Sequence, residues 1–246
     1  MNYPPAGSLL AKLYHMKLAL CLLTYNEVGC VRQMIPNLDF SSFNEVFAVD
    51  GGSTDGTLDV YREYGIRVVA QSSRGRGEAF RLAEKSTDAD AIVYFSPDGN
   101  EDPSDFSRFR YFLEQGADIV IASRMMAGAF NEEDILWWRP RKWANNFFNW
   151  AVNVFWNKTK IYITDSINGY RAIRRGLVNK LGQDAMGYTI EYQNTIRAMK
   201  KGLKIVEFPT REGQRICGRT KATSLKTAII FLHCLLREVY LGSGQK

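Results

Sequence analysis

Cysteine and histidine are scarce in this sequence, with four cysteines and two histidines among 246 residues. The cysteines lack the paired spacing of a zinc site or a disulfide framework: Cys21, Cys30, Cys217 and Cys234. His15 lies near the start and His233 within an apolar helical pattern, and neither has a neighbour that suggests catalysis. We therefore expect neither a zinc scaffold nor a disulfide scaffold, and a reducing, cytoplasmic setting.

Long apolar runs are missing as well. No segment reaches the roughly 20 apolar residues that a membrane-spanning helix needs, and residues 1–17 hold too short an apolar stretch for a signal peptide. We expect a soluble or peripheral protein. Zinc-finger spacing, an aromatic RNA-binding signature and a long basic run are absent, so we expect no nucleic-acid partner. The net charge of +6 and the pI of about 9.1 fit a diphosphate or an acidic membrane surface, or simply a solvated basic surface.

The remaining composition is that of an ordinary globular protein. Apolar residues make up 46% and charged residues 24%, which argues against disorder. A chain of 246 residues is long enough for one α/β domain with a full core. No repeat or low-complexity linker divides it, so we expect one domain over residues 1–246, with a core at about 17–221 and a C-terminal helix and tail at 222–246.

Apolar runs alternate with helical patterns in the first half of the chain. Strands are predicted at 17–23, 46–49, 66–70, 91–95 and 118–122, and helices at 28–38, 56–64, 77–86 and 104–114. This alternation is typical of βα units in an α/β fold with a Rossmann-like, mostly parallel sheet flanked by helices. The second half is less regular, with a strand-like segment at 203–208 and a final helical pattern at 223–241.

Distinctive polar residues follow the predicted strands, where loops and helix N-termini converge and ligands bind in such sheets. Asp50 ends a buried strand, and its carboxylate could accept hydrogen bonds from a base or a ribose. Asp98 and Asn100 follow another strand, and their oxygens could converge on a divalent cation that also holds a diphosphate. Both loops are also ordinary turn sequences, so a purely structural interpretation stays open.

Seven segments occur in a characteristic order and spacing: 24–27 (TYNE), 50–57 (DGGSTDGT), 74–79 (RGRGEA), 122–124 (ASR), 165–171 (DSINGYR), 187–191 (GYTIE) and 215–221 (RICGRTK). Together they resemble family 2 glycosyltransferases of the GT-A fold, and most closely the dolichol-phosphate mannosyltransferase-like group. The resemblance covers the chain from Leu18 to about Lys221. It implies transfer of a sugar from a nucleoside diphosphate sugar.

The resemblance also implies roles for individual residues. Nucleotide-sugar binding is expected of Thr24, Tyr25, Asn26, Glu27, Asp50, Gly52, Arg76, Gly77, Ser96, Pro97, Arg215 and Lys221. The expected metal ligands are Asp98 and Asn100. The expected catalytic residues are Asp98, Arg124, Asp165 and Glu191. The acceptor phosphate is expected at Arg124, Arg139, Arg141 and Lys142, for which a solvated basic patch is the alternative.

Two departures from the family pattern bear on the cofactor. Ser96 stands where the family has the first Asp of its Asp-x-Asp metal motif, and Gly51 stands where it has a second Asp after Asp50. One carboxylate with two neutral oxygens should hold Mg²⁺ or Mn²⁺ more weakly than two carboxylates do. A divalent cation is expected, and strict dependence on it stays an open question.

The acceptor that the resemblance implies is a polyprenyl or dolichyl phosphate. A phosphate is already anionic and needs no activating base, and attack opposite the leaving group would invert the anomeric centre. One alternative is transfer to a glycan or saccharide hydroxyl, with Asp165 or Glu191 as the base. Another is a nucleotide-sugar-binding protein whose metal site is weakened.

Two apolar segments concern further partners. Trp and Phe residues at 137–156 recur at near-helical spacing, which favours core packing over an acceptor-side or membrane-facing surface. The apolar run at 228–236 is too short to span a bilayer. It either packs on the protein or in a homodimer interface, or it rests on anionic headgroups. In the second case the protein would be peripheral on the inner membrane surface.

Overall fold

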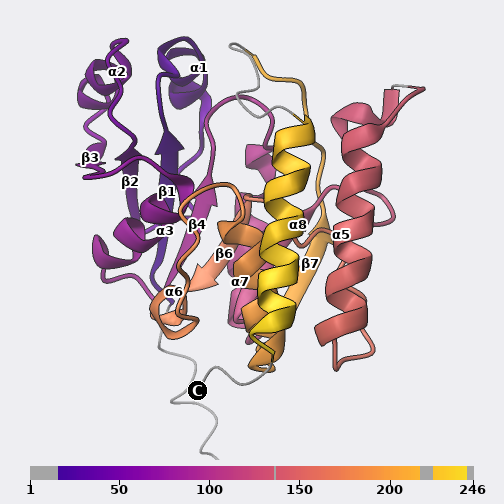
Figure 1. Cartoon of the computed structure of the whole chain (residues 1–246). Helices are drawn as coiled ribbons and strands as arrows, with labels where there is room; N and C mark the ends of the chain where they lie inside the picture. The colour runs from indigo at the N-terminus through magenta and orange to yellow at the C-terminus, as the bar shows by residue number, and fades with distance from the viewer. Residues whose placement is uncertain (1–15, 136, 217–223, 243–246) are drawn as a thin grey trace, which may run out of the picture.

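A seven-stranded sheet forms the centre of the computed structural model, which describes residues 16–135, 137–216 and 224–242 (Figure 1). Its strands are β1 (Leu18–Thr24), β2 (Glu45–Asp50), β3 (Arg67–Ala70), β4 (Ala91–Phe95), β5 (Ile119–Ser123), β6 (Arg171–Arg174) and β7 (Ile205–Pro209). Their order across the sheet is β3-β2-β1-β4-β6-β5-β7. Only β6 runs antiparallel to its neighbours β4 and β5. The predicted Rossmann-like, mostly parallel sheet is confirmed.

Helices cover both faces of this sheet. They are α1 (Val28–Met34), α2 (Thr57–Glu63), α3 (Arg76–Lys85), α4 (Phe106–Glu114), α5 (Pro140–Trp156), α6 (Leu177–Lys180), α7 (Ile190–Lys200) and α8 (Ser224–Tyr240). Short 3-10 helices are η3 (Ile35–Asn37), η4 (Pro103–Asp105) and η5 (Glu132–Ile135). Along β1, alternate side chains enter two different clusters because successive residues of a strand point to opposite faces. One cluster includes α1, α2 and α4, and the other includes α3, α5, α7 and α8.

The five predicted strands of the first half and the strand-like segment 203–208 are all found as strands. β6 was not predicted, because its four residues follow a glycine-centred segment that reads as a loop. Sheet order also depends on it, since β6 lies between β4 and β5 and joins the two parallel parts of the sheet.

The aromatic segment at 137–156 is largely exposed, so the prediction of core packing is wrong for most of it. Only Phe148 and Trp156 are buried. The exposed rings are Trp137, Trp138, Trp143, Phe147, Trp150 and Phe155. On α5 this is possible because the buried residues occupy one side of the helix and the remaining rings occupy the other. Helix α8 divides in the same way: Phe231, Cys234 and Leu235 are buried, and Ile229, Ile230, Leu232 and Leu236 are exposed.

Helices α5 and α8 pack against each other and lie side by side over one face of the sheet (Figure 1). None of the helices in the described residues is long and apolar enough to cross a membrane. Of the cysteines, Cys21 and Cys234 are free and buried. Cys30 is disulfide-bonded, a pairing that the scattered cysteines did not predict.

Candidate functional site

The carboxyl ends of β1, β2 and β4 meet at one edge of the sheet, because these strands are parallel neighbours. A cavity of about 330 Å³ opens there, between the loops that follow the strands. We call it the first cavity. Seven of the twelve residues predicted for nucleotide-sugar binding line it: Thr24, Tyr25, Glu27, Arg76, Ser96, Pro97 and Arg215. Lys221 and the rest of its 217–221 segment lie outside the described residues.

Three other predicted nucleotide residues shape the loops and do not line the cavity. Asp50 is buried, and its Oδ2 accepts hydrogen bonds from the backbone N–H groups of Gly52 and Ser53, both at 2.8 Å. Gly52 has a φ of +90°, a conformation that a side chain would strain. Asn26 Oδ1 accepts from Thr54 N at 2.9 Å and so ties the loop after β1 to the loop after β2. The turn interpretation of Asp50 is therefore the one that the geometry supports.

Gly77 acts through packing. A Cβ at this position would lie 1.9 Å from the carbonyl oxygen of Ala185, and Gly77 N donates a hydrogen bond to Met186 O at 3.0 Å. The absence of a side chain lets the start of α3 approach this backbone closely, which places the neighbouring Arg76 at the cavity wall.

Several residues that line the first cavity were not assigned from the sequence. Arg74 lies over the ring of Tyr25, with the guanidinium carbon 4.7 Å from the ring centroid, and Gln71, Gly187 and Tyr188 complete this part of the wall. Arg74, Gly187 and Tyr188 all belong to segments that carried the family resemblance. The signal was present, but the motif did not say which of its residues face the ligand.

Asp98 and Asn100 lie together, as the metal prediction requires. Asn100 N donates to Asp98 Oδ1 at 3.2 Å. Asn100 Oδ1 is buried without a hydrogen-bond partner in the described residues. Asp98 Oδ2 accepts from Arg215 Nη2 at 2.8 Å. An orphaned amide oxygen beside a carboxylate fits a hard cation, although no group of three or more His, Cys, Asp or Glu occurs among the described residues.

Glu101 is a second carboxylate near Asp98 that the sequence did not single out. Its Oε2 accepts from Ser96 N at 2.7 Å. Burial and the negative charge of Asp98 raise the pKa of Glu101 to about 8. The residue that replaces the first Asp of the metal motif thus uses its backbone to fix a carboxylate from five positions later.

A second cavity of about 230 Å³ adjoins the first. The two share Arg76, Ser96, Asp98 and Arg215 in their walls. The second cavity is additionally lined by Glu101 and by charged residues of distant segments: Arg124, Glu132, Arg141, Arg211 and Glu212. A donor in the first cavity and an acceptor in the second would therefore meet beside Asp98 and Arg215.

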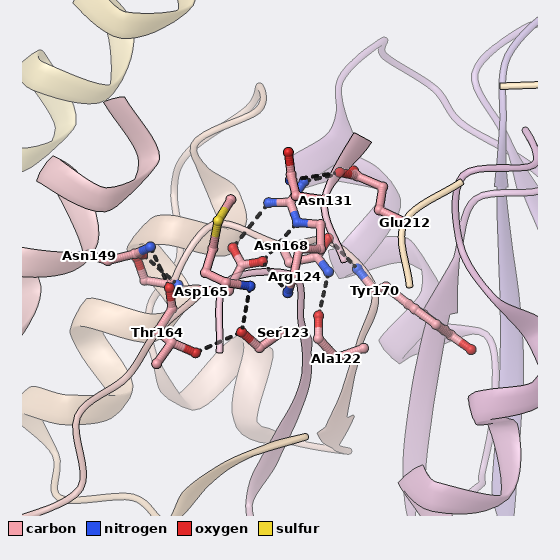
Figure 2. Close-up of polar contacts among 12 residues, drawn as sticks. Ala122, Ser123, Arg124, Asn131, Asn149, Thr164, Asp165, Asn168, Tyr170 and Glu212 are labelled. Atoms are coloured by element: carbon pink, nitrogen blue, oxygen red, sulfur yellow. Dashed lines mark hydrogen bonds and ion pairs between the residues drawn. The ribbon is translucent and has the colours of Figure 1, made fainter. Parts of the chain in front are cut away.

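Arg124 lies between two carboxylates (Figure 2). Asp165 accepts from its Nε at 2.8 Å and from its Nη2 at 3.0 Å, and Glu212 accepts from its Nη1 at 2.9 Å. Burial opposes the charge, but the two carboxylates outweigh it and raise the pKa of Arg124 well above its usual value. Asp165 is completely buried and lines neither cavity. In this position Asp165 holds Arg124, and its predicted catalytic role stays a prediction.

Glu191 has a similar position beneath Arg76. It is buried, forms an ion pair with Arg76 Nε, and lines neither cavity. Gly169 permits this pair, since a Cβ there would lie 2.0 Å from Arg76 Nη2. The nearby Arg171 is fully buried and donates to the carbonyls of Ser166, Asn168 and Glu191. Glu191 thus pairs with Arg76 behind the cavity wall, and its catalytic role likewise stays a prediction.

Three of the four residues predicted for the acceptor phosphate are paired with the acidic residues of η5. Asp134 binds Arg139 at 3.3 Å and also pairs with Lys142. Arg141 pairs with Glu132 at 3.0 Å and with Glu133 at 2.9 Å. Only Arg124 and Arg141 of the four predicted residues line the second cavity. Its cations are paired, and both the phosphate role and the solvated patch stay open.

Comparison with known proteins connects this site to a family. The model of the family described as "Glycosyl transferase family 2" matches residues 20–182. Glycosyltransferase AglJ of Haloferax volcanii is 30% identical over 198 residues, which are 78% of this chain and 62% of that protein. Polyprenol monophosphomannose synthase of Mycolicibacterium smegmatis is 28% identical, over 80% of this chain and 78% of that one.

A solved structure has the same fold. Glucosyl-3-phosphoglycerate synthase from Mycobacterium tuberculosis, in complex with Mn²⁺ and UDP-glucose, superimposes with a TM-score of 0.70. The identity is 20%, and the match covers 97% of this chain and 84% of that one. The resemblance drawn from the seven segments and the expected GT-A fold are confirmed.

Proposed function

The chain belongs to glycosyl transferase family 2, and we propose that it moves a sugar from a nucleoside diphosphate sugar to a polyprenyl or dolichyl phosphate. The observation that carries this proposal is the pair of adjoining cavities that share Asp98 and Arg215. Their arrangement supports a donor in the first cavity and an acceptor in the second. Attack from the second cavity, opposite the leaving diphosphate, would invert the anomeric centre.

The named relatives support both substrates. The Mycobacterium tuberculosis structure holds UDP-glucose with Mn²⁺, which supports a nucleotide sugar and a divalent cation here. The name of the Mycolicibacterium smegmatis enzyme supports a polyprenyl phosphate as the acceptor. The chain spans 62% of the length of AglJ, so what AglJ does as a whole protein is not transferred to it.

Asp98 and Asn100 are the residues that would hold Mg²⁺ or Mn²⁺. The bound cation would neutralise the charge that grows on the leaving diphosphate. Arg215 already lies 2.8 Å from Asp98 and is placed to contact the same diphosphate. Lys221 is proposed for that role from its motif alone, since it lies outside the described residues.

An acceptor that is already ionised fits the observed carboxylates. Asp165 and Glu191, the bases considered for a hydroxyl acceptor, are buried in ion pairs behind the cavities. A phosphate monoester needs no such base at pH 7. The buried carboxylates instead hold Arg124 and Arg76 at the cavity walls.

The exposed apolar surface of α5 and α8 supports contact with a membrane. Trp and Phe side chains of this kind are typical of membrane interfaces. Helix α5 contains no acidic residue, and the only acid of α8, Glu238, is buried against Arg197 and Lys200. Helix α5 begins at Pro140, next to Arg141 in the wall of the second cavity. A lipid whose phosphate enters that cavity could therefore extend its chain along α5.

One observation favours a second candidate function, transfer to a saccharide hydroxyl. Glu101 lines the second cavity, where a carboxylate could act as the general base toward a hydroxyl. The rival proposals differ in the acceptor that is consumed.

Product analysis separates them. The protein is incubated with UDP-, GDP- and CDP-sugars and Mn²⁺, and with either a short-chain polyprenyl phosphate or free saccharides. The proposal expects a sugar-phosphate-lipid product whose anomeric configuration is opposite to that of the donor. Glycosylated saccharide without lipid product would establish the second candidate. Thermal stabilisation by one nucleotide sugar without any product would indicate a binding protein.

A further inference from the structure

The arginines of the second cavity differ in whether they have a carboxylate partner. Four of the five that line it are in ion pairs: Arg76 with Glu191, Arg124 with Asp165 and Glu212, Arg141 with Glu132 and Glu133, and Arg215 with Asp98. Arg211 is the fifth. Within residues 16–135, 137–216 and 224–242 it has no ion pair, and its side chain is exposed.

The backbone around Arg211 is fixed. Phe130 N donates to Thr210 O at 3.0 Å, and Glu212 N donates to Phe130 O at 2.8 Å, so a β-bridge holds the residue on both sides. The guanidinium carbon lies 5.3 Å from the centroid of the Phe130 ring. Neighbouring Glu212 is half-buried and binds Arg124, while Arg211 is exposed. The bridge thus presents Arg211 at the cavity wall, stacked on Phe130 and without a carboxylate partner among the described residues.

We propose that Arg211 binds the phosphate of the acceptor, an inference that rests on the proposed function. A paired arginine offers a phosphate only the N–H groups that its carboxylate does not use, and freeing the others would leave that carboxylate without its partner. Arg211 has no such cost. Its fork of N–H donors suits bidentate binding of phosphate oxygens. The shared wall of Asp98 and Arg215 places this phosphate next to the leaving diphosphate.

Binding measured without a sugar donor tests the assignment. Calorimetry compares a water-soluble short-chain polyprenyl phosphate with the uncharged polyprenol for wild type, Arg211→Ala and Arg211→Lys. Loss of one charge-assisted contact should weaken phosphate binding about 10- to 100-fold in Arg211→Ala, and less in Arg211→Lys. Binding of a nucleoside diphosphate should be unchanged. Arg175→Ala is the matched control, since this exposed arginine pairs with Asp88 away from both cavities.

The outcomes are distinct. If Arg211→Ala binds polyprenyl phosphate as tightly as wild type, the assignment of Arg211 is overturned. If Arg139→Ala or Lys142→Ala weakens that binding instead, the proposed function is left intact. Wild-type protein that does not prefer the phosphate to the alcohol would overturn the proposed acceptor and the role of Arg211 together. Unchanged thermal unfolding of the variants excludes misfolding as the cause of any loss.

Discussion

The two cavities that meet at Asp98 are built in different ways. Apart from Gly187, Tyr188 and Arg215, the first is formed by the ends of parallel strands and the segments that follow them, and hydrogen bonds connect neighbouring loops, as Asn26 does with Thr54. The second is held by ion pairs between segments far apart in the chain. Arg124 binds Asp165 and Glu212, which are 41 and 88 positions away. A site made from strand-end loops keeps its local sequence signature, whereas one made from long-range pairs does not.

Loss of the shared carboxylate should have the largest effect. Asp98→Ala removes the only carboxylate of the metal motif, and transfer should fall at least about 100-fold. Steady-state transfer assays check this. Asp102→Ala is the control on the same loop, because Asp102 caps Ser104 N and lines neither cavity. Retention of more than about a tenth of wild-type activity by Asp98→Ala, a change of only ~1.4 kcal/mol, would contradict the metal assignment.

Arg215→Ala should separate the phosphate part of the first cavity from the part that holds the nucleoside. Affinity for a nucleoside diphosphate should fall about 10- to 100-fold, with little change for the nucleoside. Affinity for Mn²⁺ without nucleotide should rise, because Asp98 loses its competing cation. Calorimetry measures all three.

Arg74→Ala is the comparison for Arg215. Its guanidinium lies over the ring of Tyr25 and forms no ion pair with Asp98, so the loss should be equal for nucleoside and nucleoside diphosphate. If the two variants lose affinity for nucleoside and for nucleoside diphosphate in the same proportion, Arg215 does not bind the diphosphate.

The exposed apolar surface of α5 and α8 should contribute to membrane binding and not to the transfer reaction itself. Trp143→Ser combined with Trp150→Ser should lower binding to anionic vesicles by roughly tenfold or more, as measured by flotation at low salt. Transfer to a water-soluble acceptor should be retained. Tyr64→Ser with Tyr111→Ser is the control, because it removes exposed rings just after α2 and on α4, on the other face. Unchanged flotation together with a smaller oligomer would instead identify the surface as a homodimer interface.

The smallest expected effect concerns Glu101 and the dependence of the unfolding free energy on pH. Folding raises the pKa of Glu101 from 4.5 to about 8, so folding favours its protonated form. Its contribution is fully present below about pH 4.5 and is lost as the pH rises to about 8. Asp98, Arg76 and Arg124 are the charged groups that act on it.

Glu101→Gln should therefore flatten the decline of unfolding free energy between about pH 5 and 8, as measured by urea titration at several pH values. Glu207→Gln is the comparison, because burial raises the pKa of Glu207 to about 7. The part of the decline in unfolding free energy that this variant removes should therefore end at a lower pH than the part that Glu101→Gln removes. A wild-type slope in Glu101→Gln would contradict the assigned pKa.

Most of the first cavity could be predicted from the sequence. Parallel strands bring their carboxyl ends to one edge, so loops marked by TYNE, by the glycine-rich turn after Asp50 and by Asp98 had to converge. What the sequence did not give is the direction of individual groups. Asp50 and Gly77 were assigned to the ligand, yet their groups face the protein's own backbone. A motif fixes the position of a loop but not which of its atoms point outward.

The sequence by itself determined the class of fold, the family and the edge of the sheet where the site lies, because strand periodicity and strand-end motifs are local properties of the chain. Only the tertiary structure decided the pairing of charges and the exposure of the aromatic side of α5. Acidic residues of η5 pair with Arg139 and Arg141 of the predicted phosphate cluster. Asp165 and Glu191 pair with Arg124 and Arg76. Whether a charged group is free depends on which distant segment folds against it, and no local pattern encodes that.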